Sequence, residues 1–381
     1  LRVVRHDDRL DDSPSLQAHG PHTEIPDGLE TASLKRYGFS SWEDLYTQTQ
    51  LDIIKAALGA VSGLKVSKPV ADHLRLAILG STEMAGYVCR WERYNPKGLE
   101  AIANHRFSRS TVTVETNLLS TSGRGTLPRR FAAAERALRW MHAEGYPTRT
   151  SHADASSRRR SVSGALVVTG SSERQLLPSG AVQLVFTDPP YHDDLQYGEL
   201  ARLFHFWMKS AGYIQQPLEE QEAVPNSVRG ATTKHYEDKV TACLTESNRV
   251  LASNGRLVLT FHNRDMNAWE ALANALERAG FEVVGLAAVA AENPADHSKR
   301  GKQSLLSDLV IECLRRRKNN RRPNVLTVQG IGPGSEKKNL HAIGLALAEC
   351  VNRREGKIEA LFEQNAKRLK CRKILIRRGG R

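Results

Sequence analysis

The segment Asp188-Pro189-Pro190-Tyr191 has residue types and spacing that are suited to chemistry. Proline lacks a backbone N–H and has a fixed φ angle, so the two prolines hold the neighbouring carbonyl oxygens in fixed directions. A carboxylate beside fixed carbonyl oxygens is a cluster of hydrogen-bond acceptors, which suits the two hydrogens of an amino group. Hydrogen bonds of this kind favour a pyramidal nitrogen whose lone pair can attack an electrophilic methyl group. Tyr191 offers a flat face on which a planar ring can stack.

Strands and helices must position these residues. Apolar runs predict strands, and the segments between them have helical periodicity. Alternating strands and helices predict an open α/β sheet with mostly parallel strands, in which ligands bind at the carboxyl ends. Asp188 follows one such strand, and His262-Asn263 follow another and face the same crevice in one reading. The predicted strands are Ala165–Thr169, Val182–Phe186, Leu257–Phe261, Phe281–Leu286 and Leu309–Cys313.

Two predicted helices follow from stop signals and periodicity. One runs roughly from Asp238 to Leu251, and Asn254-Gly255 is its stop signal. The other spans Glu336 to Leu369. Composition then divides the chain into five parts. We expect a polar joining segment at 1–30, a mainly helical domain at 31–150, a linker at 151–163, a catalytic domain at 164–314 and a basic helical extension at 315–381.

Charge is unevenly distributed along the 381 residues. The net charge is +13, and the segment 315–381 holds 19 Lys and Arg against 5 Asp and Glu, so the rest of the chain is nearly neutral. A basic extension of this kind either contacts nucleic-acid phosphates or is a solvated charged surface, and composition alone leaves both readings open.

Several protein classes do not fit the sequence. No apolar run approaches the roughly 18 residues that a membrane span needs, and the first residues lack a signal-peptide pattern, so we expect a cytoplasmic protein without membrane contact. The five cysteines do not have zinc-ribbon spacing. His192-Asp193-Asp194 lack further ligands at suitable spacing, and we therefore expect no metal site.

Asp188-Pro189-Pro190-Tyr191 resembles the signature of amino-group DNA methyltransferases, which modify adenine N6 or cytosine N4. Outside the signature, further segments resemble the large adenine-specific DNA methylase family, some members of which carry a zinc ribbon. The resemblance covers about residues 30–314. The segments are Lys35-Arg36-Tyr37-Gly38 with Trp42-Glu43-Asp44-Leu45, Cys89-Arg90-Trp91, Glu115-Thr116-Asn117, Tyr197-Gly198-Glu199-Leu200, Phe204-His205-Phe206-Trp207-Met208 and Leu305–Val310. It implies a Rossmann-like domain that uses S-adenosylmethionine to methylate DNA, most often in restriction-modification or phage defence.

The resemblance also implies roles for individual residues. Asp188 and the Pro189 carbonyl would orient the target amine, Pro190 would shape the loop, and Tyr191 would stack on a flipped-out base. Ser171 and Ser172 follow the preceding strand and would lie near the cofactor, as would Asp188. The cations expected to contact DNA phosphates are Lys299, Arg300, Lys302, Arg315, Arg316 and Arg317.

One element of the family is missing from the expected place. The family has a glycine-rich strand and turn for the cofactor near its N-terminus, and no such stretch precedes Asp188. The sheet would therefore lack its first strands unless a partner subunit supplies them. Gly330-Ile331-Gly332-Pro333-Gly334 is either a substitute cofactor loop or a plain loop into the terminal helix.

Three functions remain open on the sequence. The first is an adenine-specific DNA methyltransferase, which needs a partner for activity if its cofactor pocket is incomplete. The second is a catalytically incomplete DNA-binding subunit or fragment. The third is methylation of cytosine N4, of RNA or of a protein side-chain amide, where related signatures also occur.

Overall fold

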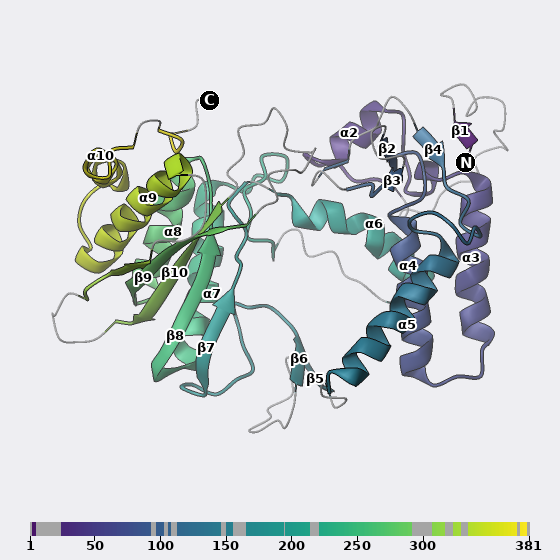
Figure 1. Ribbon diagram of the computed structural model, residues 1–381, viewed down its shortest axis with the longest axis horizontal. Helices are drawn as coiled ribbons and strands as arrows, with labels where there is room; N and C mark the ends of the chain where they lie inside the picture. The colour runs from purple at the N-terminus through teal and green to yellow at the C-terminus, as the bar shows by residue number, and fades with distance from the viewer. Residues whose placement is uncertain are drawn as a thin grey trace. The chain divides into compact units, whose positions relative to one another are not determined.

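The computed structural model describes residues 2–4, 24–92, 97–102, 106–107, 113–145, 150–154, 165–193, 195–213, 221–291, 307–316, 323–328, 334–371 and 374–378. The chain divides into two compact units. Unit 1 comprises 1–146 and 196–222, and unit 2 comprises 147–195 and 223–381. Figure 1 labels the helices and strands of both units.

Unit 1 consists mainly of helices. Its helices are α2 (Thr31–Arg36), η1 (Glu43–Leu45), α3 (Gln48–Gly63), α4 (Lys68–Thr82), α5 (Leu127–Ala143) and α6 (Tyr197–Ser210). A small antiparallel sheet has the order β1-β4-β2-β3. Its strands are β1 (Arg2–Val4), β2 (Arg90–Glu92), β3 (Lys97–Leu99) and β4 (Thr113–Glu115).

Helix α6 belongs to unit 1, which differs from the predicted catalytic domain at 164–314. Buried Trp207 of α6 donates a hydrogen bond from Nε1 to the Tyr46 hydroxyl at 2.9 Å. Buried Glu199 accepts hydrogen bonds from three backbone N–H groups at the start of α2, at Leu29, Glu30 and Thr31. The unit in which an amphipathic helix packs is determined by the residues that bury its apolar face, and not by its position in the sequence.

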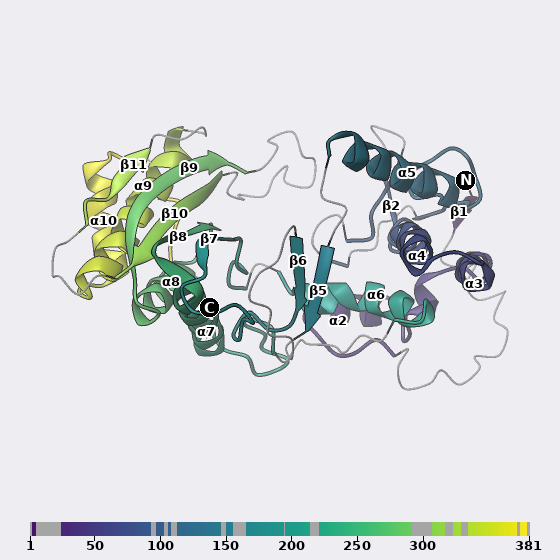
Figure 2. The ribbon, with the colours of Figure 1, turned by 90° about the horizontal axis from the view of Figure 1, so that it is seen from below.

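Unit 2 contains a five-stranded mixed sheet with the order β11-β9-β10-β8-β7. Its strands are β7 (Val182–Thr187), β8 (Leu251–Phe261), β9 (Phe281–Ala290), β10 (Ser307–Arg315) and β11 (Leu326–Val328). β7 is parallel to β8, and β11 is parallel to β9, whereas β10 is antiparallel to both neighbours. The mixed α/β architecture agrees with the prediction, but the sheet is not mostly parallel. Figure 2 shows β7 beside β8 at the edge of this sheet.

Helices α7 (Thr233–Val250), α8 (Met266–Arg278) and α9 (Gly334–Arg353) pack on one face of the sheet. Their buried side chains form one cluster with alternate residues of β8, β9 and β10, because successive side chains of a strand alternate between faces. α10 (Ile358–Arg368) packs on α9. The segment expected as a basic extension therefore contributes Ile343, Leu347 and Val351 to the core, and its predicted single helix is two.

The opposite face of the sheet is only partly covered. Leu184 and Phe186 of β7 are 54% and 69% exposed, although a strand that ends in the signature would be expected in a sheet interior. Their register partners Arg256 and Val258 lie on the same face. Strands β5 (Thr150–Asp154) and β6 (Ala165–Thr169) form a separate two-stranded parallel sheet.

Candidate functional site

Strand register brings four polar side chains together at one end of the unit 2 sheet. Thr187, the last residue of β7, pairs with Leu259 of β8, so that Asp188 lies beside Thr260. Leu309 of β10 pairs with Phe261, and this antiparallel register places Asp308 beside His262. The cluster therefore combines the carboxyl ends of two strands with the amino end of a third.

The two oxygens of the Asp188 carboxylate have different surroundings. Oδ1 accepts hydrogen bonds from the Tyr191 hydroxyl at 2.5 Å and from the Thr260 hydroxyl. Oδ2 accepts no hydrogen bond from any residue that the structure describes, and the residue is exposed. One oxygen thus fixes the orientation of the carboxylate while the other stays open to a ligand.

Tyr191 is half-buried and connects the two acidic residues of the cluster. Its hydroxyl lies 3.4 Å from Asp308 Oδ2, and its ring packs edge-on against Phe261 and His262, with centroid separations of 5.3 and 4.6 Å. Burial, reinforced by the hydrogen bond to Asp188, raises the pKa of the Tyr191 phenol well above its usual value. The hydroxyl is therefore a donor at neutral pH. Stacking of Tyr191 on a base stays a prediction.

Two long-range hydrogen bonds hold the backbone after the prolines. Tyr236 of α7 donates to the Pro190 carbonyl at 3.0 Å, and Asn263 donates to the Tyr191 carbonyl at 2.8 Å. The Pro189 carbonyl accepts no hydrogen bond from the described residues. Together with Asp188 Oδ2, it leaves two acceptors at the end of β7 that have no donor among the described residues, and their use in binding an amine stays a prediction.

His192 also fixes this loop, through an unusual backbone conformation. Its φ angle is 63°, in the left-handed region that few residues other than glycine adopt. The buried imidazole compensates by bonding the Thr233 hydroxyl and the Asp193 carboxylate, each at 3.1 Å. The hydrogen bond with His192 lowers the pKa of the Asp193 carboxyl.

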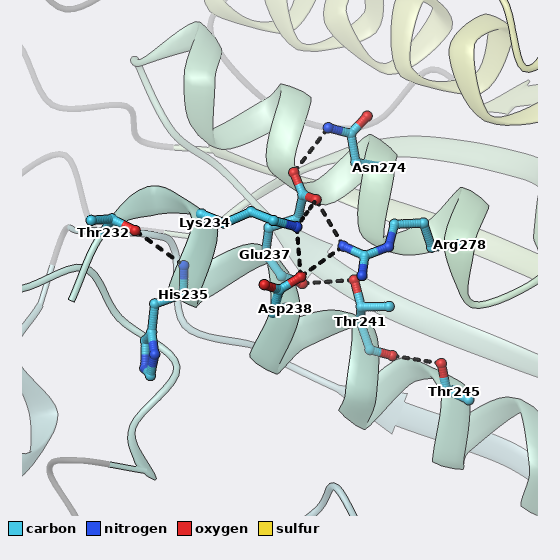
Figure 3. Close-up of polar contacts among 9 residues, drawn as sticks. All are labelled: Thr232, Lys234, His235, Glu237, Asp238, Thr241, Thr245, Asn274 and Arg278. Carbon is cyan, nitrogen blue, oxygen red and sulfur yellow. Dashed lines mark hydrogen bonds and ion pairs between the residues drawn. The ribbon is translucent and has the colours of Figure 1, made fainter.

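A network of charged side chains fixes α7, which carries Tyr236, against α8 (Figure 3). Glu237 accepts hydrogen bonds from Asn274 at 2.9 Å and from Arg278 at 2.8 Å. Asp238 is bonded to Arg278 at 2.9 Å and to Lys234 at 2.7 Å. Ion pairs that are partly exposed to water contribute modestly to stability. Because these contacts join α7 to α8, we assign them the role of positioning α7.

Comparisons with known proteins identify no family for this chain. No known family profile matches the chain, and no curated protein matches it. A candidate DNA modification methylase from Thermus thermophilus is similar in structure over 45% of this chain and 68% of its own, with a TM-score of 0.22 and 14% identity. A similarity of this size does not establish a shared fold.

The predicted cofactor residues lie in an exposed turn after β6. The Ser171 hydroxyl contacts Glu173 at 3.2 Å, and Glu173 forms an ion pair with Lys239 of α7 at 3.1 Å. Ser172 is exposed. The contacts of Ser171 therefore do not involve the loop of Asp188, and a cofactor role for the two serines stays a prediction.

Among the predicted DNA-contacting cations, Arg315 and Arg316 bond to the protein itself. Arg315 donates to the Leu251 carbonyl at 2.9 Å, and Arg316 donates to the Phe281 and Val351 carbonyls at 2.8 and 2.6 Å. Burial lowers the pKa of Arg316. The two guanidinium groups thus join elements of unit 2. Outside the described residues lie Lys299, Arg300, Lys302, Arg317, Asp194 and residues 330–333 of the glycine-rich loop.

Neither a metal site nor a membrane span is found in the part of the chain that the structure describes. Its His, Cys, Asp and Glu residues form no group of three or more that could hold a metal ion. None of its helices is both long and apolar enough to cross a membrane. All five cysteines are free thiols, and burial raises the pKa of Cys243 and of Cys350 to about 11. Thiolate chemistry is therefore not favoured at neutral pH.

Sequence reasoning missed Thr260, Asp308 and Tyr236 as members of the site. Each lies far from Asp188 along the chain, and hydrogen bonds bring them to its loop. Asp308 begins a strand that runs antiparallel to β8, so only the register reveals that it neighbours His262. The position of His262 and Asn263 after a strand was the one usable signal.

Proposed function

We propose that this chain orients the exocyclic amino group of a DNA base for methylation by S-adenosylmethionine, with adenine N6 as the acceptor. The observation that carries the proposal is the Asp188 carboxylate, whose Oδ1 is fixed by two hydroxyl donors while Oδ2 stays open. The open carboxylate oxygen and the open carbonyl of the next residue, Pro189, provide acceptors for the two hydrogens of one amino group. Adenine is preferred over cytosine because the first signature residue is Asp and because the sequence resembles the adenine-specific family.

S-adenosylmethionine would supply the methyl group on a positively charged sulfur. The described residues fit the amine side of such a reaction better than the donor side. They place no glycine-rich turn between a strand and a helix next to Asp188, and β7 pairs with β8 alone in its sheet. Ser171 and Ser172 are the residues proposed to approach the cofactor.

The experiment is transfer of labelled methyl from S-adenosylmethionine to double-stranded DNA. Asp188→Ala is the test variant, and Asp52→Ala, an exposed aspartate on α3 of unit 1, is the matched control. We expect transfer by the wild type and the control, and a loss of at least about 100-fold in Asp188→Ala. Equal transfer by Asp188→Ala would refute the role of the signature.

Substrate class is tested with the same assay. Duplexes that lack adenine or lack cytosine, single-stranded RNA and a protein substrate with side-chain amides are compared under one salt condition. Label in adenine-containing DNA alone supports the proposal. Label in RNA or protein would move the chain to the third function considered above.

A second function is favoured by the position of β7, which among the described residues pairs with β8 alone and exposes apolar side chains on one face. The chain would then be one part of a methyltransferase and would depend on a partner that supplies the cofactor-binding strand. Exposed Leu184 and Phe186 support this reading, because parallel strands are normally covered on both faces. Calorimetric titration with S-adenosylmethionine separates the two functions: binding by the chain alone supports the self-sufficient enzyme, and the absence of binding supports the dependent subunit.

A further inference from the structure

His262 and Asp308 form a hydrogen-bonded pair next to the signature. His262 Nδ1 contacts Asp308 Oδ1, and the two side chains are only 19% and 15% exposed. The pair is produced by register, since His262 follows β8 and Asp308 lies at the amino end of β10. The proposed orientation of the amine uses neither residue.

A carboxylate at Nδ1 determines what the other ring nitrogen can do. It fixes the ring proton on Nδ1, which leaves Nε2 with a lone pair that can accept a proton. Nε2 of His262 has no hydrogen-bond partner among the residues that the structure describes. The imidazole centroid lies 4.6 Å from that of the Tyr191 ring, whose hydroxyl bonds Asp188. Tyr191 thus contacts both the proton acceptor His262 and the Asp188 carboxylate that would hold the amine.

Methylation of an amine requires such an acceptor. When the nitrogen forms its bond to the methyl carbon, the electron pair of the carbon–sulfur bond stays on sulfur and the nitrogen becomes positively charged. It must then lose one proton to give the neutral methylamine. Imidazole is a stronger base than carboxylate by roughly 2 pKa units in model peptides, so a histidine suits this step better than Asp188 does.

We propose that His262 is the catalytic base that takes the amine proton on Nε2, and that Asp308 is the positioning residue that holds its tautomer. The proton then leaves the imidazolium for solvent. This inference rests on the proposed function, because it assumes that an amino group occupies the acceptors of Asp188 and Pro189. It adds a proton acceptor to a site that the signature describes only as a binding surface for the amine.

The first test does not need methyl transfer. The full chain is labelled with ¹⁵N-histidine, and the tautomer of His262 is read from its two nitrogen shifts, with His262→Gln used for assignment. We expect the Nδ1–H form, which Asp308→Asn shifts toward the Nε2–H form. An Nε2–H tautomer in the wild type, or no change in Asp308→Asn, would overturn the proposal.

Adenosine and N6,N6-dimethyladenosine are the probes for contact with the amine. We expect adenosine to shift the Nε2 resonance, and the dimethylated nucleoside, which has no amine hydrogen, to leave it unchanged. A shift at His192, the labelled neighbour of Tyr191, without a shift at His262 would overturn the base role and leave the proposed function standing. No shift anywhere in the site would count against both.

Kinetics give the second test. We expect His262→Gln to lower kcat by roughly 10²- to 10⁴-fold while KM for DNA changes little, and Asp308→Asn to have a smaller effect of the same kind. His73→Gln, an exposed histidine on α4, is the matched control. An unchanged kcat in His262→Gln refutes the base role. If the wild type transfers no methyl group, the proposed function of the chain alone fails. The tautomer measurement still tests whether Asp308 holds the ring proton of His262 on Nδ1.

Discussion

At the residue scale, the site depends on the difference between the two oxygens of one carboxylate. Thr260 and Tyr191 both donate to Asp188 Oδ1, from a neighbouring strand and from the loop itself. A carboxylate held by two donors loses rotational freedom before any ligand arrives, so less ordering is required when an amine binds. We therefore expect the hydroxyl of Tyr191 to contribute to the site in addition to its ring.

Tyr191→Phe and Thr260→Val test this arrangement, because each removes one hydroxyl and keeps the shape of the side chain. A hydrogen bond to a charged group contributes about 1.5–3 kcal/mol, so we expect each variant to lower the rate of methyl transfer by roughly 10-fold or more. Single-turnover transfer measures the effect. If Tyr191 acts by stacking alone, Tyr191→Phe keeps full activity and Tyr191→Leu loses it.

Tyr46 gives a prediction for the dependence of stability on pH. Burial raises the pKa of its phenol well above the usual value of about 10, and burial raises that of Tyr191 in the same direction. Since the folded state favours the neutral phenol, this contribution to stability is complete below pH ~10 and is lost as the pH rises above it. Thermal unfolding measured from pH 8 to 11 should show a steep fall in Tm above pH ~10.

Tyr46→Phe is the variant for this measurement. It should lower Tm at pH 8, because the Trp207 N–H loses an acceptor and the Thr82 carbonyl loses a donor. It should also reduce the fall in Tm above pH ~10. A fall as steep as that of the wild type would show that other groups control alkaline unfolding.

At the element scale, α7 connects a surface network to the site. Glu237, which is largely buried, and exposed Asp238 bond to Arg278 of α8, and the buried side of α7 carries Tyr236. The two sides contribute differently because ion pairs in water are screened, whereas a buried hydroxyl that leaves a carbonyl without a donor is costly.

We therefore expect Tyr236→Phe to lower the free energy of unfolding by about 1–2 kcal/mol, and Arg278→Ala to lower it by less than about 1 kcal/mol. Urea denaturation of the full chain measures both values. Tyr236→Phe should also reduce methyl transfer, since the Pro190 carbonyl is released. A larger loss of stability in Arg278→Ala than in Tyr236→Phe would contradict this division of roles.

Gly255 shows why the start of β8 was predicted wrongly. Asn254-Gly255 has the form of a helix stop and lies before the predicted strand Leu257–Phe261, but β8 begins at Leu251 and contains both residues. A Cβ atom at Gly255 would lie 3.0 Å from the Val182 carbonyl oxygen of β7, next to an irregularity in the strand register. The glycine permits close approach of two strands, and this requirement cannot be read from local sequence.

At the scale of the whole molecule, unit 2 has one well-covered sheet face, and among the described residues β7 is an edge strand that pairs with β8 alone. The covered face includes α9, so the basic segment 315–381 is in part a structural element. Charge counting over the whole segment cannot distinguish a tail from a core helix, because the cations of α9 lie only at its ends and the residues between them are mostly apolar.

The open edge predicts self-association of the isolated chain. Unpaired backbone groups beside exposed apolar side chains favour strand pairing between molecules, and a lysine at an edge opposes it. We expect Leu184→Lys to reduce concentration-dependent association in light scattering. Leu76→Lys, a similarly exposed leucine on α4, should leave it unchanged. Association equal to that of the wild type in Leu184→Lys would show that this edge is not the contact.

The sequence by itself predicted the strand before Asp188, several of the helices and the α/β class, and it offers the signature as a prediction of acceptor chemistry. These features depend on local patterns, namely side-chain alternation, helical periodicity and the geometry of proline. Only the tertiary structure decided that Thr260, Asp308 and His262 lie at the same end of the sheet, that α6 packs in unit 1 and that α9 completes the core. The physical reason is that register and packing are set by contacts between residues far apart in the chain. Many strand pairings satisfy the same local pattern, and only burial of the complete set of apolar side chains selects one of them.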